Sequence, residues 1–564
     1  MAETPNPSTN NAHGGTHAVN AAVAYGVTTM FTLSGAHVFP LYDAAVGGKA
    51  CVDGGIPGPM RLVDVRHEQT AVFAAEATAK LTRTPGLAVV TAGPGVTNAV
   101  SGITTAHFNG SPVVVLGGRS PDYRWGSGAL QELDQPPILA PITKSAQTVH
   151  DTAEIGAAVS RGFATALAPH RGPVFIDVPM DILFSYADVP SAMAIPAEIY
   201  EPDPDAINRI AALIAAAHHP VVVLGSDAWT GKAEVQAKEF IESTGIPTVA
   251  NGMGRGILAR NSPHLITRAR SAAFGQADLV IVVGTPLDFR LGYGVFGGKD
   301  GATPAKVAHI VDAGSQLSST ATPDAFVVAD IDRSLRALLD AVNALPKRPD
   351  LQQWSQELAA IATKAAAKDQ IDLASDADPI HPARIYGELI SRCEDDAVII
   401  GDGGDFVSFA GKYVEPNQPG GWLDPGPYGC LGTGLGYAMA ARLARPSSQV
   451  VLMLGDGAAG FSLLDIDSLV RQNLPVVMIV GNNGIWGLEK HPMQFLYQYD
   501  VAAELAPGTR YDQIAIALGG GGETVTRPQD IGPAMDRAFA SGIPYLVNVI
   551  TDPTVAYPRS TTGI

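Results

Sequence analysis

Cysteine, charge and long apolar runs are all scarce in this chain of 564 residues. Its three cysteines, Cys51, Cys393 and Cys430, are far apart and form no CxxC pair, which argues against a disulfide framework or a zinc site. No apolar run approaches the ~20 residues of a membrane span. The polar residues 1–15 lack the apolar core of a signal peptide. We therefore expect a soluble, cytoplasmic protein in a reducing compartment.

Basic residues are also too few to balance the acidic ones. The 37 lysines and arginines stand against 55 aspartates and glutamates, which gives a formal net charge of −18. Such a surface repels nucleic acid and anionic membranes, so neither is an expected partner. Glycine and proline are abundant instead, with 61 and 42 residues, and 46% of the chain is hydrophobic. This composition is typical of a compact α/β enzyme with many tight turns.

The chain divides into three blocks in which apolar strands alternate with helices. The blocks cover residues 14–190, 203–346 and 379–552. This alternation predicts an α/β fold of three domains, each with a doubly wound parallel sheet. A hydrophilic stretch, 347–378, is interpreted as a linker between the second and third blocks. Residues 553–564 form a tail without clear periodicity.

The third block contains a βαβ unit with metal-ligand residues at its strand ends. We predict a strand over 450–454, a turn over 455–460, a helix over 461–472 and a strand over 474–480. Because parallel strands end at one edge of a sheet, Asp456 and Asn483 are expected to lie together. Their oxygens and the carbonyl of Ile485 suit Mg²⁺, which prefers hard oxygen ligands. Without this context, Gly455-Asp456-Gly457 would be an ordinary turn.

Gly455-Asp456-Gly457 followed by Asn482-Asn483 resembles the signature of thiamine-diphosphate-dependent enzymes, and the resemblance extends over nearly the whole chain. It implies Mg²⁺ and thiamine diphosphate as cofactors, with Gly457 and Ala458 beside the diphosphate. Residues 403–405 match a loop that helps to bind the diphosphate, which adds Gly404 and Asp405 as candidates. Residues 427–434 match a segment that holds the cofactor bent. There Gly429 would contact the aminopyrimidine, and Leu431 would lie under the cofactor.

Glu68 is the candidate for activating the cofactor. It follows the predicted strand 62–65 and begins a predicted helix over 68–81. A glutamate at a helix start is by itself explained by the helix dipole. Within the resemblance, Glu68 matches the glutamate on the aminopyrimidine N1′, which promotes removal of the thiazolium C2 proton. Residues 91–98 match the family's glycine-rich turn on the same side.

Two branches of the family compete for the reaction. Residues 34–40 resemble acetolactate synthases, whereas residues 130–135 resemble oxalyl-CoA decarboxylases and 2-hydroxyacyl-CoA lyases. The lyase branch is favoured because the tail departs from the synthase ending, and actinobacterial lyases of 2-hydroxyisobutyryl-CoA are the best match. The implied reaction cleaves a 2-hydroxyacyl-CoA to formyl-CoA and a ketone or aldehyde. Carboligation of a 2-oxo acid, oxalyl-CoA decarboxylation and a non-catalytic binding role are the alternatives.

Further residues have two interpretations each. Glu489 is a candidate for handling the proton of the substrate hydroxyl, or a solvated loop carboxylate. His37 and Gln131 are candidates for the substrate pocket, and His37 is equally explained as a structural histidine. Arg270 and Asp312 are candidates for a nucleotide in the central block, such as ADP, although no GxGxxG motif is present.

The last expectations concern the C-terminal tail and the oligomeric state. Residues 559–562 could close over CoA as a lid, or they could belong to a frayed terminus. The resemblance also implies a homodimer or homotetramer. In this family the Glu68-type block of one subunit faces the metal-type block of another, so the active site would lie at the subunit interface.

Overall fold

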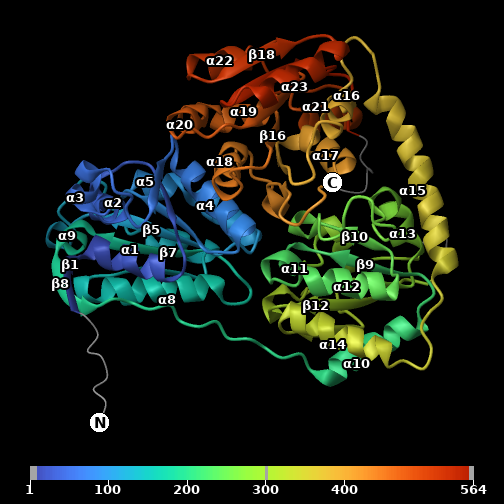
Figure 1. Ribbon diagram of the computed structural model, residues 1–564, viewed down its shortest axis with the longest axis horizontal. Helices are drawn as coiled ribbons and strands as arrows, with labels where there is room; N and C mark the ends of the chain where they lie inside the picture. The colour runs from blue at the N-terminus through green and yellow to red at the C-terminus, as the bar shows by residue number, and fades with distance from the viewer. Residues whose placement is uncertain (1–8, 299–302, 558–564) are drawn as a thin grey trace.

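The structure is a computed structural model that describes residues 9–298 and 303–557 (Figure 1). It confirms the predicted fold class, because the chain forms three α/β domains around parallel sheets. Figure 1 shows the N-terminal domain in blue and teal, the central domain in green and yellow, and the C-terminal domain in orange and red. Within the described residues, no helix combines the length and apolarity needed to cross a membrane.

The N-terminal domain has a six-stranded parallel sheet in the order β3-β2-β4-β5-β7-β6. Its strands are β2 Thr29–Thr32, β3 Arg61–Asp64, β4 Gly86–Val90, β5 Val113–Arg119, β6 Ser145–Thr148 and β7 Val174–Pro179. The main helices are α1 Gly14–Ala24, α4 Glu68–Thr82 and α8 Ile155–Leu167. β4, β5 and β7 are buried along their whole length, because helices cover both faces of the sheet. A short antiparallel pair, β1 Thr9–His13 and β8 Tyr186–Pro190, brings the ends of this domain together.

The central domain has a five-stranded parallel sheet in the order β10-β9-β11-β12-β13. Its strands are β9 Pro220–Leu224, β10 Thr248–Ala250, β11 Leu279–Val283, β12 Lys306–Val311 and β13 Ala325–Val328. The principal helices are α10 Pro204–Ala216, α12 Glu234–Thr244 and α14 Ile331–Asn343. The carboxyl ends of β9 and β12 lead directly to Asp227 and Asp312.

The stretch interpreted as a linker contains the longest helix among the described residues, α15 Gln352–Leu373. It runs along the side of the central domain and leads toward the C-terminal domain (Figure 1). Its alanines, lysines and glutamines have high helix propensity. Only Trp354, Leu358 and Asp369 are buried, so it lacks the broad apolar stripe that marks an ordinary surface helix. The stretch therefore connects the two domains largely as a helix, which the sequence pattern did not predict.

The C-terminal domain has a six-stranded parallel sheet in the order β15-β14-β16-β17-β19-β18. Its strands are β14 Val398–Asp402, β15 Trp422–Leu423, β16 Val450–Gly455, β17 Val477–Asn482, β18 Gly521–Val525 and β19 Tyr545–Ile550. Helices near the site are α17 Gly404–Tyr413, α18 Gly434–Ala444, α19 Asp456–Ser462, α20 Ile466–Arg471 and α21 Gly487–Tyr497.

The helix predicted over 461–472 is different in the structure. It begins earlier, as α19 at Asp456, and a 3₁₀ turn at Leu463–Asp465 separates it from α20. The interruption has a tertiary cause, because the Asp465 carboxylate accepts hydrogen bonds from the backbone N–H of Arg66 (2.8 Å) and the hydroxyl of Thr70 (2.7 Å). A local sequence pattern does not reveal these partners.

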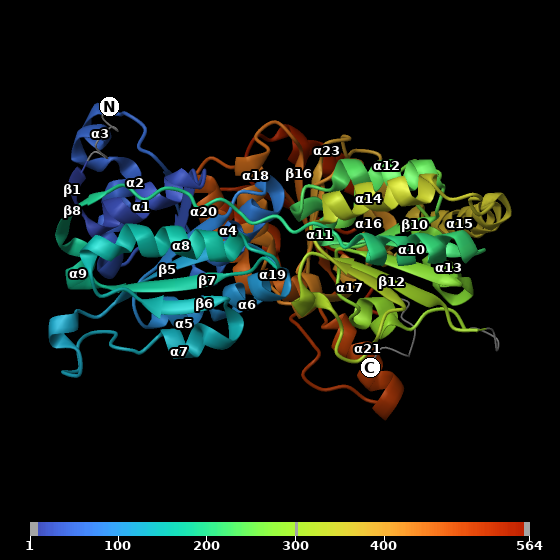
Figure 2. The ribbon, with the colours of Figure 1, turned by 90° about the horizontal axis from the view of Figure 1, so that it is seen from below.

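Helices α4 and α18 join the N-terminal and C-terminal domains, and they lie side by side in Figures 1 and 2. The fully buried Glu76 of α4 accepts a hydrogen bond of 2.8 Å from the hydroxyl of Tyr437 on α18. Lys80 is 3.5 Å from the same carboxylate. A Cβ on Gly436 would lie 2.8 Å from Cβ of Phe73, so glycine lets the two helices pack closely. This contact fixes Glu68, at the start of α4, relative to the C-terminal domain.

Candidate active site

The predicted metal ligands lie at the carboxyl edge of the C-terminal sheet. β16 and β17 pair in register up to Gly455 and Gly481, so Asp456 and the turn after Asn482 leave the sheet together. The Asp456 carboxylate accepts hydrogen bonds from the backbone N–H groups of Gly484 (2.6 Å) and Gly457 (2.9 Å). The two turns are therefore tied through the carboxylate itself.

The surroundings of Asp456 fit a bound cation. Its side chain is almost fully buried, and within the described residues no basic side chain forms an ion pair with it. Burial raises the pKa of this carboxyl to about 6, although the N–H groups of Gly484 and Gly457 counteract the effect. A divalent ion would favour the charged form and would complement the amide oxygen of Asn483 and the carbonyl of Ile485. Mg²⁺ is therefore a suitable occupant on the chemistry of the donor set.

The two asparagines after β17 have different environments. Asn482 is buried and donates hydrogen bonds to the Asn548 side chain (3.1 Å) and the Thr509 carbonyl (3.0 Å), which holds the sheet edge together. Asn483 is partly exposed, and its side-chain oxygen accepts a bond of 3.2 Å from the N–H of Ile485. Asn483 is thus the member of the pair that is available for a ligand.

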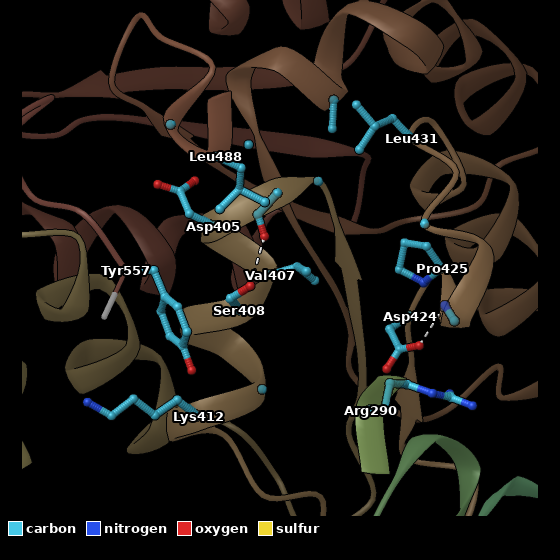
Figure 3. Close-up of a pocket in the computed structure, with 18 of the residues that line it drawn as sticks. Arg290, Asp405, Val407, Ser408, Lys412, Asp424, Pro425, Leu431, Leu488 and Tyr557 are labelled. Carbon is cyan, nitrogen blue, oxygen red and sulfur yellow. Dashed lines mark hydrogen bonds between the residues drawn. The ribbon is translucent and has the colours of Figure 1, made fainter. Parts of the chain in front are cut away.

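A cavity of about 910 Å³ opens beside this edge. It brings together most of the predicted cofactor residues of the C-terminal domain, namely Gly404, Asp405, Gly429, Leu431, Asp456, Gly457, Ala458, Ile485 and Glu489. Asn483 lies next to this lining rather than in it. Figure 3 shows Asp405, Ser408, Lys412 and Tyr557 along one wall and Leu431, Pro425, Asp424 and Arg290 along the opposite wall. The exposed Glu489, in the first turn of α21, is therefore part of the cavity wall.

Basic side chains also contribute to the cavity lining, and most were not predicted; this set is called the basic wall below. They are Arg255, Arg268, Arg270, Arg290 and Lys412. Four of them have acidic partners: Arg290 is bidentate on Asp288, Arg255 contacts Glu415, and Arg268 and Lys412 share Asp369. In the sequence these residues are scattered over 158 positions among ordinary helices and loops, and no short motif connects them.

Arg270 is the exception in this wall. Its guanidinium donates to the Asn251 side-chain oxygen (2.6 Å) and to the Arg290 carbonyl (2.7 Å), and no carboxylate in the described part of the chain forms an ion pair with it. Burial, together with the neighbouring charges of Arg290 and Arg255, lowers its pKa to about 10. A cation held in this way is suited to an anionic ligand group.

Glu68, His37 and Gln131 gather elsewhere, around the turn 91–98 of the N-terminal domain. The Glu68 carboxylate accepts a hydrogen bond of 3.0 Å from Asn98, and His37 Nδ1 lies 3.1 Å from the Thr91 hydroxyl. A Cβ on Gly93 would lie 3.0 Å from that of Gln131, so the turn and the Gln131 loop touch. Burial lowers the pKa of His37, which favours its neutral form. None of the three lines the cavity of its own chain.

Comparison with known proteins decides the family. The models for the N-terminal, central and C-terminal domains of thiamine pyrophosphate enzymes match residues 12–138, 207–338 and 402–549. The chain belongs to the thiamine pyrophosphate enzyme family. Acetolactate synthase large subunit IlvG of Mycobacterium tuberculosis is 46% identical over 97% of both chains. 2-Hydroxyacyl-CoA lyase 2 of Mus musculus is 32% identical over 91% of this chain and 85% of its own, and that of Homo sapiens is 31% identical over 95% and 90%.

Family membership makes this chain a thiamine-diphosphate-dependent enzyme of the lyase or carboligase type. It also relates the two groups of predicted site residues, one around the cavity and one around Glu68, to two different domains of the family. Asp456 and its neighbours in the cavity lie in the part matched by the C-terminal thiamine pyrophosphate (TPP) binding domain, and we refer to them as the diphosphate-side half-site. The residues around Glu68 lie in the part matched by the N-terminal TPP binding domain and outside the cavity lining, and we refer to them as the pyrimidine-side half-site.

The nucleotide site predicted from Arg270 and Asp312 finds no support in the structure. Arg270 lines the cavity, whereas Asp312 lies at the end of β12 and binds Arg171 (3.0 Å) and His170 (3.3 Å) of the N-terminal domain. The two residues therefore belong to different places. α/β domains often hold nucleotides at the carboxyl edge of their sheet, but at the end of β12 Asp312 is paired with side chains of the N-terminal domain instead.

The described part of the tail reaches the cavity. Tyr557 lines it and packs edge-on against Phe409 of α17, with ring centroids 5.0 Å apart. Arg559, Ser560, Thr561 and Thr562, the residues predicted as a lid, lie outside the described residues.

Proposed function

We propose that this enzyme is a lyase that cleaves a 2-hydroxyacyl-CoA, with 2-hydroxyisobutyryl-CoA as the expected substrate, to formyl-CoA and a ketone or aldehyde. The basic wall of the cavity is the observation that carries the proposal. Five basic side chains line the cavity of a protein whose net charge is −18, and Arg270 among them has no carboxylate partner in the described residues. A CoA thioester carries several phosphate charges, whereas a 2-oxo acid carries one carboxylate. The 2-hydroxyacyl-CoA lyase 2 relatives support the same substrate class.

The residues of this chain would divide the work of binding and proton transfer. Asp456, Asn483 and the Ile485 carbonyl would hold Mg²⁺ and, through it, the diphosphate. Bound thiamine diphosphate supplies a carbon nucleophile that adds to a carbonyl and accepts its electrons. Glu68 would hold a proton at N1′ of the aminopyrimidine, and Glu489 would take the proton of the substrate hydroxyl.

The remaining cavity residues would orient the substrate. Arg270 is the first candidate for a phosphate of CoA, because its charge has no carboxylate partner among the described residues. Tyr557 lines the same space and would help to exclude water from the site. His37 and Gln131 would approach the substrate from the pyrimidine-side half-site of a second copy.

The two half-sites also support a homo-oligomer with shared active sites. Glu68 does not line the cavity of its own chain, which supports a site that a second copy would complete. A homodimer would supply this copy, and a homotetramer would contain two such pairs.

A carboligase acting on pyruvate is the second candidate. The 46% identity to an acetolactate synthase large subunit favours it, as does the resemblance of residues 34–40 to that branch. It does not account for the extent of the basic wall. The two candidates also differ in cofactor content, since a synthase-like enzyme would be expected to carry flavin.

The deciding experiment offers both substrates to the same purified enzyme with thiamine diphosphate and Mg²⁺. Formyl-CoA from 2-hydroxyisobutyryl-CoA, followed by liquid chromatography and mass spectrometry, is the expected product. The Glu68→Gln variant is the matched control and should form none. Acetolactate from pyruvate without any formyl-CoA would overturn the proposal and establish the second candidate. Absence of both products, with a Glu68→Gln variant that retains ligand binding, would indicate a non-catalytic role.

A further inference from the structure

We propose that Asp402 is a positioning residue of the diphosphate-side half-site: its carboxylate holds the turn 429–434 against the end of β14 and thereby sets the position of Leu431 in the cavity. The proposal rests on the proposed roles of Gly429 and Leu431 toward the cofactor. Asp402 itself does not line the cavity, so it would act through the turn.

The carboxylate of Asp402 makes two hydrogen bonds to the turn. Asp402 is the last residue of β14, pairs in register with Leu454 of β16 and is fully buried. One oxygen accepts from the backbone N–H of Gly432 (3.1 Å) and the other from that of Gly434 (2.8 Å). These amides flank Thr433 and lead into α18, so a single side chain fixes the end of the turn and the start of the helix.

The turn has little freedom to move away from this position. Gly432 has φ +88°, and a Cβ there would lie 2.7 Å from Cβ of Phe461. A Cβ on Gly434 would lie 2.9 Å from the Asp402 carboxylate. Both positions therefore need glycine for the turn to reach Asp402. With the turn closed, Leu431 is held in the cavity wall (Figure 3).

Asp402 also connects two walls of the cavity. The chain continues from it into Gly403, Gly404 and Asp405, which line the cavity on the side of the proposed diphosphate loop. Through its side chain it holds the segment that carries Leu431, on the side of the proposed aminopyrimidine contact. The distance between these two contacts thus depends on one buried carboxylate.

Among the described residues, the groups that stabilise the charge of Asp402 by hydrogen bonding are these two backbone N–H groups. Within the described residues no basic side chain pairs with it, and the titratable neighbours Cys430 and Tyr437 are uncharged near neutral pH because burial raises the pKa of each. Burial raises the pKa of Asp402 to about 7, although the amides of Gly434 and Gly432 oppose this. Protonation would convert an acceptor into a donor that faces an N–H group, so the turn should loosen as pH falls below 7.

The test is Asp402→Asn, which preserves size but presents an amide NH₂ to one of the two backbone donors. The measurement is the exchange rate of the C2 proton of bound thiamine diphosphate, followed by acid quench and NMR. This rate is independent of the acyl substrate, so a failure of CoA-ester cleavage would leave the test intact. We expect the rate to fall about 10- to 100-fold, as for loss of a charge-assisted hydrogen bond. Cofactor affinity should change much less, and the acid limb near pH 7 should disappear.

Three further variants make the result decisive. Leu431→Ala should reproduce the loss of exchange, and Gly432→Ala should do so by moving the amide while leaving the carboxylate in place. Gly432→Ala also keeps the proposal testable if Asp402→Asn fails to fold. Asp227→Asn, a buried strand-end carboxylate of the central domain, is the matched control and should exchange normally. Wild-type exchange and an unchanged pH profile in Asp402→Asn or Gly432→Ala, or wild-type exchange in Leu431→Ala, would overturn the proposal.

Discussion

Replacing His170 by glutamine is expected to weaken the contact between the N-terminal and central domains, and to do so most strongly at acidic pH. His170 belongs to the N-terminal domain, between α8 and β7. Its Nδ1 atom lies 3.3 Å from the Asp312 carboxylate and 3.7 Å from that of Asp227, both in the central domain. Asp227 also accepts a bond of 2.7 Å from Gln316. Arg171 adds a 3.0 Å ion pair to Asp312.

The magnitude follows from the charges of this cluster. Two buried carboxylates and one guanidinium leave one negative charge, which protonated His170 neutralises. At an effective dielectric constant of about 20, unit charges 3.3–3.7 Å apart attract by about 4.5–5 kcal/mol before desolvation is subtracted. Removing one partner of a buried pair typically costs about 3–5 kcal/mol. We therefore expect a loss of about 3 kcal/mol where His170 is charged.

The pH dependence follows from the pKa of His170. Burial lowers this pKa, but Asp227 and Asp312 together raise it more, so the folded value lies above the ordinary one. A raised folded pKa stabilises the protein fully below the unfolded value of about 6.5. This stabilisation is lost as pH rises through the folded pKa. Lys144 and His107 also face His170, and burial lowers the pKa of each, that of Lys144 to about 8. Both remain in the variant, so the difference between the two proteins reports His170.

Thermal unfolding of both proteins at pH 6 and pH 8.5 measures this difference. A loss of 3 kcal/mol corresponds to a fall in Tm of roughly 6–12 °C for a domain of this size. The gap should shrink at pH 8.5. His150→Gln is the matched control, because His150 lies 2.6 Å from Asp122 in an exposed pair that contributes about 1 kcal/mol or less. An equal or larger gap at pH 8.5 would refute the assignment of charge to His170.

Four other predictions concern the active site. Glu68→Gln should lower turnover at least about 100-fold while cofactor affinity stays within a few-fold, as measured by steady-state kinetics and calorimetry. Asp456→Asn should lose thiamine diphosphate on desalting and need more Mg²⁺ for activity, because it removes the only charged ligand proposed for the ion; retention of cofactor at wild-type Mg²⁺ would contradict this. Mixing these two inactive variants under conditions of subunit exchange should restore partial activity, and no recovery would argue against shared sites. Arg270→Met should raise KM for the CoA ester about 10-fold and leave turnover of any 2-oxo acid unchanged, whereas an equal loss for both substrates would exclude a specific phosphate contact.

Local sequence patterns predicted the parts of the site that lie within one short unit of strand, turn and helix. The strand that ends at Gly455 and the turn at Asn483 belong to one βαβ unit, so the approach of Asp456 to that turn follows from topology. Glu68 was placed correctly at a helix start for the same reason. The break in the helix at Asp465 was missed, because its cause is a contact with Arg66 almost 400 positions away.

The basic wall is an example of a feature that residue spacing in the sequence cannot predict. Arg268 and Lys412 come from different domains, yet both meet Asp369 of α15, a helix that the sequence pattern did not reveal. Such a set exists only after the domains have packed, so residue spacing could not predict it. The same reasoning applies to Asp312, whose assignment to a nucleotide site finds no support in the structure. A carboxylate at the end of β12 suits a nucleotide as well as a protein cation, and only the position of His170 and Arg171 decides between them.

The position of Glu68 relative to the cavity depends on one packing contact within the chain, between α4 and α18. Glu76 and Tyr437 hold α4 against α18, and this contact fixes the start of α4, with Glu68, at a position outside the cavity lining. The cavity beside Asp456 is directed instead toward the central domain, whose Arg270 forms part of its wall. A single chain that brought Glu68 to Asp456 would have to break the buried Glu76–Tyr437 contact and expose a carboxylate that is fully buried. Association of two copies would need no such change, so the internal packing of the chain supports the proposed homo-oligomer with shared sites.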